Sequence, residues 1–210
     1  MNTYGAIVSE GLKMEIAKKK ITVLFATVIF FIMVSYFFID IPVAIFCKSL
    51  PPGVRDLFET ITPLGVSTWY LAGSFSLFLL FRYYRRRIYA HRALFLFAAV
   101  AVSGIAAAFL KWVMGRFRPK VFFEGDLYGF NFFNTAHEET SFPSGHSATA
   151  FSLALVLSLF FPRYRLPLFC FAVIVSASRV IITSHYLSDA VGGAFIALMT
   201  VFLLRKRFPL

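Results

Sequence analysis

The sequence predicts an all-α membrane protein, a bundle of six transmembrane helices whose N- and C-termini are both cytoplasmic. Three observations support this fold class. Hydrophobic residues make up 59% of the 210-residue chain and charged residues only 15%, whereas soluble chains carry about 25% charged residues. Six apolar segments recur along the chain, and about 20 apolar residues cross a bilayer. Basic residues concentrate in alternate connections between these segments, as they do in cytoplasmic loops.

The six apolar segments define the expected helices. They comprise residues 21–39, 64–81, 93–110, 147–161, 166–182 and 190–204. The fourth and sixth are short and can be lengthened from Phe142 and Tyr186. The first follows three lysines and has no small-residue cleavage site, so it predicts a retained helix rather than a signal peptide. We therefore assign residues 21–210 to one membrane domain.

Residues 1–20 form a separate, mixed segment. Apolar residues recur every fourth position from Tyr4 to Ile16, with charged residues between them. This pattern predicts a short cytoplasmic amphipathic helix on the membrane surface, and a disordered basic tail is the alternative.

The charge distribution sets the expected orientation. With the N-terminus inside, most of the 21 basic residues fall in the inner connections, so the net charge of +11 reflects topology and not a nucleic-acid partner. Three polar segments, residues 111–119, 141–147 and 178–189, then share the outer face. The long connection 111–146 is rich in phenylalanine, and we expect it to fold over the site or enter the interface.

The first polar segment offers two cations. Lys111 and Arg118 are seven residues apart, which places them on one helical face if the helix continues until Pro119 stops it. Beside Gly115, two such cations suit a phosphate group, although the same residues could simply anchor a helix at the headgroups. Arg116 and Lys120 are further candidates for contact with anionic headgroups.

The second segment, SFPSGHS, opens an apolar helix. Ser144 is a plausible N-cap. Backbone N–H groups at a helix start bind anions, and Gly145 lets a ligand approach the backbone closely. His146 then lies within reach of that anion. A plain turn with an interfacial histidine is the alternative.

The third segment offers a nucleophile. Arg179 lies near the outer end of the fifth helix, and His185 and Asp189 are four residues apart. A carboxylate bound to one imidazole nitrogen fixes the tautomer and raises the basicity of the other nitrogen. An ion pair that only stabilises a short loop is the alternative. Taken together, the three segments favour an enzyme, because ionisable residues beside transmembrane helices are costly and usually functional.

In order and spacing, the three segments resemble the signature of the type 2 phosphatidic acid phosphatase (PAP2) superfamily. Lys111 with Arg118-Pro119, Pro143 to His146, and Ser178-Arg179 with His185 and Asp189 match every signature position. The resemblance implies hydrolysis through a phosphohistidine, with no metal and no cofactor. It makes His185 the nucleophile, Asp189 its orienting carboxylate and His146 the leaving-group acid. The implied phosphate-binding residues are Lys111, Arg118, Ser144, Gly145 and Arg179.

The expected activity is hydrolysis of a membrane lipid phosphate or diphosphate. Undecaprenyl diphosphate, phosphatidylglycerol phosphate, phosphatidate and the 1-phosphate of lipid A all remain open as substrates. Phosphoryl transfer between lipids and phosphate-dependent lipid transport are the alternatives, and uncharged helix interiors argue against transport. The expected location is the bacterial inner membrane, with the site within residues 111–189 facing the periplasm.

Overall fold

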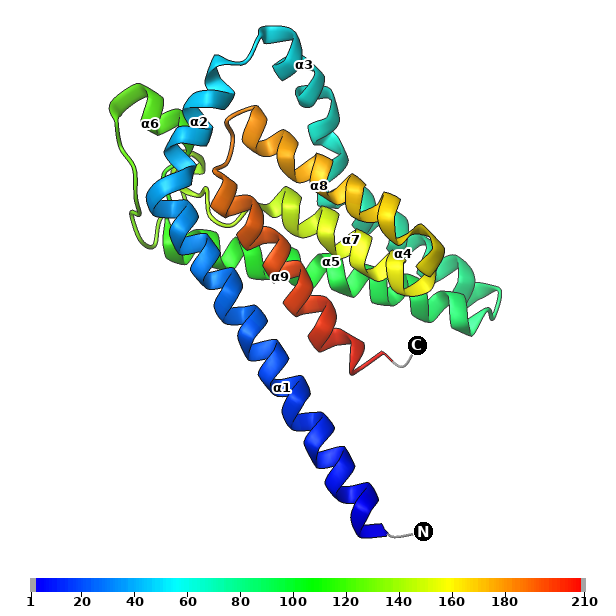
Figure 1. Cartoon of the computed structure of the whole chain (residues 1–210). Coiled ribbons are helices and arrows are strands. Elements are labelled where there is room, and N and C mark those ends of the chain that lie inside the picture. Colours follow the sequence, from blue (N-terminus) through cyan, green and yellow to red (C-terminus); the bar gives the residue numbers. More distant parts are fainter. Residues whose placement is uncertain (1–2, 209–210) are drawn as a thin grey trace.

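The computed structural model describes the backbone of residues 3–208, with the side chains of Glu15 and of residues 19–208. Within this range the protein is helical and has no β-strand (Figure 1). The α-helices are α1 (Thr3–Val34), α2 (Asp40–Ser49), α3 (Pro52–Ile61), α4 (Ser67–Tyr83), α5 (Arg87–Met114), α6 (Pro119–Gly125), α7 (Gly145–Phe160), α8 (Arg165–Ile181) and α9 (Leu187–Arg205). The all-α prediction is therefore confirmed.

Five helical segments are long and apolar enough to cross a membrane. They are Lys19–Ser49, Pro52–Tyr83, Arg87–Met114, Pro162–Ile181 and Leu187–Arg205. The expected fourth span corresponds to α7, which is apolar but only 16 residues long. Five spans are thus directly supported by length and composition, and a sixth through α7 stays a prediction.

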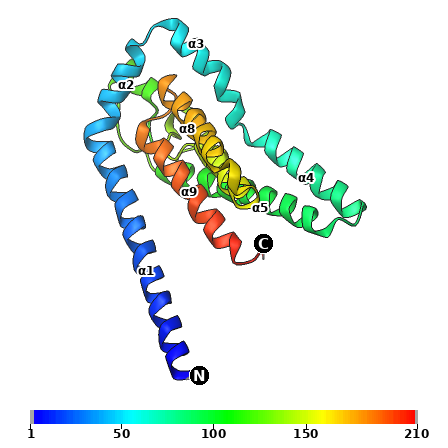
Figure 2. The same cartoon turned by 45° about the vertical axis from the view of Figure 1, so that its right-hand side comes forward.

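The helix α7 lies at the centre of the bundle and packs against α5, α8 and α9. Small residues make this close packing possible: Ala148, Ala150 and Ala154 on α7 are fully buried. In the turned view, α1 lies on one side of α8 and α9, while α3 and α4 lie on the other (Figure 2). The start of α7 contacts α9 and the turn Thr62–Gly65, which are both distant from it in sequence.

The first helix is longer than the sequence pattern predicts. It begins at Thr3 and continues through residue 20 without a break, and its first half extends past the other helices (Figure 1). A π-helical turn, Ser35–Ile39, then joins it to α2. The prediction that residues 1–20 form an amphipathic helix on the membrane surface depends on their side chains. Of these, only Glu15, Lys19 and Lys20 are among the described side chains. That expectation stays a prediction.

Candidate active site

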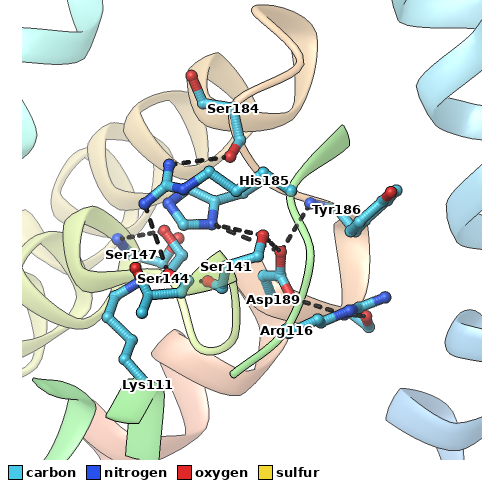
Figure 3. A network of polar contacts seen from close by, with 12 residues as sticks. Lys111, Arg116, Ser141, Ser144, Ser147, Ser184, His185, Tyr186 and Asp189 are labelled. Carbon is cyan, nitrogen blue, oxygen red and sulfur yellow. Dashed lines mark hydrogen bonds and ion pairs between the residues drawn. The ribbon is translucent and has the colours of Figure 1, made fainter. Parts of the chain in front are cut away.

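The structure brings the three polar segments together at one end of the bundle. Lys111 comes from the last turn of α5, Ser144 from the start of α7, and His185 from the turn between α8 and α9 (Figure 3). Asp189 follows in the first turn of α9. The expected convergence on one site is visible in this view.

His185 and Asp189 face each other in a buried pair. The Nδ1 atom of His185 lies 3.4 Å from Oδ2 of Asp189, and the two side chains are 3% and 0% exposed. Ser141 Oγ donates to the same carboxylate oxygen at 2.5 Å, and the Tyr186 backbone N–H donates to it at 2.8 Å. With Nδ1 turned toward the carboxylate, Nε2 is the nitrogen left for chemistry.

Burial favours the neutral form of His185. Loss of hydration lowers its pKa well below the ordinary value of 6.5, and the positive charges of Lys111 and Arg118 lower it further. The hydrogen bond and charge of Asp189 act in the opposite direction without reversing the shift. A neutral imidazole at pH 7 retains the lone pair that a nucleophile needs.

The start of α7 lies directly against the His185–Asp189 pair. Ser144 is the N-cap, as expected, because its hydroxyl accepts the backbone N–H of Ser147. Its own N–H donates to the carbonyl oxygen of Asp189 at 2.9 Å. Close contact between α7 and α9 requires Gly193, since a Cβ there would lie 2.2 Å from the Ser144 carbonyl oxygen. The N-terminus of α7 and the His185–Asp189 pair are therefore held in a fixed position relative to each other.

His146 packs in the first turn of α7 against a second glycine. A Cβ on Gly65 would lie 2.7 Å from Cδ2 of His146 and 2.8 Å from a Val175 methyl group. The charges of Lys111, Arg118 and Arg179 all act on His146. Lys111 and Arg118 therefore act on both His146 and His185.

Three cations, Lys111, Arg118 and Arg179, form what we call the cation cluster. Lys111 Nζ donates to the carbonyl oxygens of Thr140 and Ser141 at 2.5 and 3.1 Å. Arg118 donates to the carbonyl oxygens of His137 and Ser184 at 2.7 and 3.2 Å. Arg179 donates to the Thr62 hydroxyl at 3.0 Å.

The bonds of the cation cluster all end on neutral oxygens. Within the described part of the chain, none of its three members is paired with a carboxylate within 4.0 Å. Arg179 Nε is also buried and has no hydrogen-bond partner there. Such a cluster can accept the charge of a phosphoryl group.

One detail of the sequence prediction is wrong. Lys111 and Arg118 do not share a helical face, because α5 ends at Met114 and Gly115 adopts the left-handed conformation with φ of 55°. A Cβ at Gly115 would lie 1.7 Å from the Asn131 carbonyl oxygen, so only glycine fits this turn. Pro119 does not stop the helix but begins α6. The two cations meet instead because both approach the Thr140 carbonyl, at 2.5 Å from Lys111 and 3.5 Å from Arg118.

A second departure concerns Arg116, which does not contact headgroups. It is 1% exposed and forms ion pairs with Asp189 at 2.5 Å and with Asp40 at 2.7 Å. Four aromatic rings also surround its guanidinium at 4.5–5.8 Å, those of Tyr36, Tyr128, Phe130 and Tyr186. Burial lowers the Arg116 pKa, but the two carboxylates outweigh it and raise the pKa above its ordinary value. Lys120, by contrast, is exposed and pairs with Glu138 at 2.7 Å.

We call Asp40, Arg116 and Asp189 the buried ion-pair cluster. Asp40 also accepts hydrogen bonds from Ser35 at 2.8 Å and from the backbone and hydroxyl of Ser188. It therefore joins the π-helical turn and α2 to the first turn of α9. Sequence reasoning missed Asp40, although a lone carboxylate in an apolar segment is a signal in its own right.

The fold and the site define a class of protein: an all-helical membrane protein whose buried histidine–aspartate pair lies beside three cations that no carboxylate of the described chain pairs with. A family model described as the PAP2 superfamily matches residues 92–209. Lipid A 1-phosphatase of Rhizobium etli is 33% identical over 173 residues, which cover 77% of this chain and 74% of that protein. The chain belongs to the PAP2 superfamily, and it is a membrane phosphatase.

Two solved structures share the fold. Aquifex aeolicus LpxE superposes with a TM-score of 0.63 at 22% identity, over 82% of this chain and 98% of that one. A transmembrane PAP2-type phosphatidylglycerolphosphate phosphatase from Bacillus subtilis gives a TM-score of 0.58 at 21% identity, over 89% and 94% of the two chains.

Proposed function

We propose that the protein hydrolyses a lipid phosphate at the outer face of the membrane through a phosphohistidine intermediate. The observation that carries this proposal is the buried His185–Asp189 pair beside the cation cluster, and the lowered pKa of His185 favours its neutral form. A neutral imidazole supplies the nucleophile, and unpaired cations stabilise the negative charge of the phosphoryl group in the transition state.

In the first step, His185 Nε2 attacks phosphorus and forms a P–N bond. The bond between phosphorus and the lipid oxygen breaks, and that oxygen takes a proton from His146. Asp189 and Ser141 hold the imidazole so that Nδ1–H remains directed at the carboxylate. The cation cluster, the Ser144 hydroxyl and the N–H of Gly145 at the start of α7 contact the phosphoryl oxygens.

In the second step, a water molecule attacks the phosphohistidine. His146, now neutral, accepts a proton from this water while the P–N bond breaks and its electrons return to His185. Inorganic phosphate leaves, and both histidines recover their starting protonation states. We propose no metal in either step, because Lys111, Arg118 and Arg179 supply the positive charge that such a reaction requires.

The substrate we propose is a lipid of the lipid A 1-phosphate type. Its support is the 33% identity to a protein named lipid A 1-phosphatase over most of both chains. We further propose a bacterial inner-membrane location, six spans including α7, cytoplasmic termini and a site that faces the periplasm. The distribution of basic residues and the placement of the three polar segments at one end of the bundle support this topology.

Phosphate release by purified protein in detergent tests the activity. The wild type should release phosphate from lipid A, whereas His185→Ala should lose activity by a factor on the order of 10⁵ or more. EDTA should leave the wild-type rate unchanged. Undecaprenyl diphosphate, phosphatidylglycerol phosphate and phosphatidate serve as comparison substrates, and labelled acceptor lipids reveal any phosphoryl transfer. Full activity of His185→Ala on every substrate contradicts the proposed intermediate.

The pH dependence tests the protonation states. His185 must be neutral and His146 protonated in the first step, so the rate should follow a bell-shaped profile. Since the His185 pKa is lowered below 6.5, the acidic limb should lie below pH 6.5, and activity should be lost as pH falls through it. The measurement is kcat/KM for phosphate release from pH 4 to pH 9. A flat profile contradicts the assignment of both histidines.

A further inference from the structure

A cavity of about 630 Å³ lies next to the cation cluster on the side of α2 and α3. Its basic lining residues come from separate parts of the chain: Lys48, Arg55, Arg118, Lys120 and His137. Ser184, the residue before His185, also lines it. We call it the outer cavity.

The positive charge of the outer cavity is only partly balanced. Its two acidic residues, Glu124 and Glu138, both pair with Lys120. In the described residues, no carboxylate lies within 4.0 Å of the charged groups of Lys48 or Arg55.

Lys48 and Arg55 both line the cavity wall. Lys48 Nζ lies 5.4 Å from the centre of the Phe123 ring. Arg55 Nε is buried and has no hydrogen-bond partner within the described chain. Their neighbours Asp56 and Glu59 on α3 are exposed and do not line the cavity.

Arg118 belongs to both the outer cavity and the cation cluster. It donates to the carbonyl oxygens of His137 and Ser184, which line the cavity, and its Nη2 lies 3.5 Å from the Thr140 carbonyl that Lys111 also binds. The Arg118 charge is the first cause of a lowered His137 pKa. One ligand can thus contact Arg118 at the cation cluster while another part of the same ligand occupies the outer cavity.

We propose that the outer cavity is a second anion subsite, in which Lys48 and Arg55 bind a further phosphate or carboxylate of the same lipid headgroup. The preferred substrates are then lipids whose headgroup carries a second anionic group besides the phosphate that is removed. This inference rests on the proposed lipid phosphatase activity. It adds that Lys48 and Arg55 select the substrate without taking part in the chemical step.

The test compares two substrates that differ by one phosphate. They are lipid A with phosphates on both sugars and the monophosphorylated form that keeps only the 1-phosphate. In Lys48→Ala/Arg55→Ala, KM for the doubly phosphorylated lipid should rise about tenfold, which corresponds to about 1.4 kcal/mol of lost binding free energy. The ratio of the two KM values should approach one, and kcat for both should stay near the wild-type value.

Arg163→Ala is the matched control, because Arg163 is an exposed cation at the opposite end of α7. It should leave the KM ratio unchanged. If the double variant is poorly folded, Lys48→Glu alone serves, because Lys48 is exposed. An unchanged KM ratio in a folded variant overturns the subsite alone. Failure of the wild type to hydrolyse any lipid phosphate overturns the proposed function instead.

Discussion

The cation cluster and the buried ion-pair cluster lie on either side of His185. They differ in whether their charged groups have partners of opposite charge. In the buried ion-pair cluster, Arg116 is balanced by Asp40 and Asp189, and aromatic rings complete its surroundings. In the cation cluster, Lys111, Arg118 and Arg179 donate only to neutral oxygens among the described residues. In the first cluster every charged group has an oppositely charged partner without a ligand. In the second, no described carboxylate pairs with the cations.

This difference separates stability from function. Removing one partner of a buried ion pair leaves an uncompensated charge and is strongly destabilising. Removing one of several neighbouring cations relieves repulsion, so it costs activity while stability is kept or gained. The comparison therefore predicts which mutations unfold the protein and which only inactivate it.

The largest effect on stability should come from Arg116→Met. The substitution leaves Asp40 and Asp189 buried without their shared cation, which costs about 3–5 kcal/mol. It should lower the midpoint of thermal unfolding in detergent and also reduce kcat, because Asp189 then orients His185 less well. Denaturant or thermal unfolding followed by circular dichroism measures the first effect, and phosphate release measures the second.

The matched control is Arg116→Met/Asp40→Asn. It removes Arg116 together with one of the two carboxylates, so Asp189 no longer faces a second buried negative charge. Stability should recover by a large part of the loss, as expected for residues that interact directly. If the double variant is as unstable as the sum of the single variants, the buried ion-pair cluster does not act as a unit.

The opposite behaviour is expected of Arg179→Gln. Losing one donor to developing negative charge typically lowers kcat by about 10²–10³-fold, and the Thr62 hydroxyl is the described hydrogen-bond partner it leaves behind. The unfolding midpoint should stay at or above the wild-type value. A decrease in stability comparable with that of Arg116→Met removes the distinction between the two clusters.

The predictable part of this site is the part that local spacing determines. Four residues bring Asp189 next to His185, and a serine before a helix makes Ser144 an N-cap. The all-helical membrane class also followed from apolar runs. These features depend on residues close in sequence, so a single sequence suffices to infer them.

The missed part depends on contacts between distant segments. Arg116 and Asp40 are 76 residues apart, and their spacing gives no sign that they meet. Arg116 lies in sequence between Lys111 and Arg118, and its position therefore predicted contact with lipid headgroups. The end of α5 at Met114 was, in contrast, available from the sequence, because Gly115 followed by Pro119 is a typical helix stop.

Ligand binding should give the smallest and most specific effect. An anion that occupies the cation cluster compensates its charge, so vanadate, a phosphate mimic, should inhibit and should raise the unfolding midpoint of the wild type. At 100 times its dissociation constant, such a ligand adds about 2.7 kcal/mol of stability. The gain should diminish in Arg179→Gln, whereas Arg163→Ala should keep it, because Arg163 lies far from the site at the other end of α7. An equal shift of the unfolding midpoint in all three proteins indicates that the anion binds elsewhere. The cation cluster is then not the site that binds the phosphoryl group.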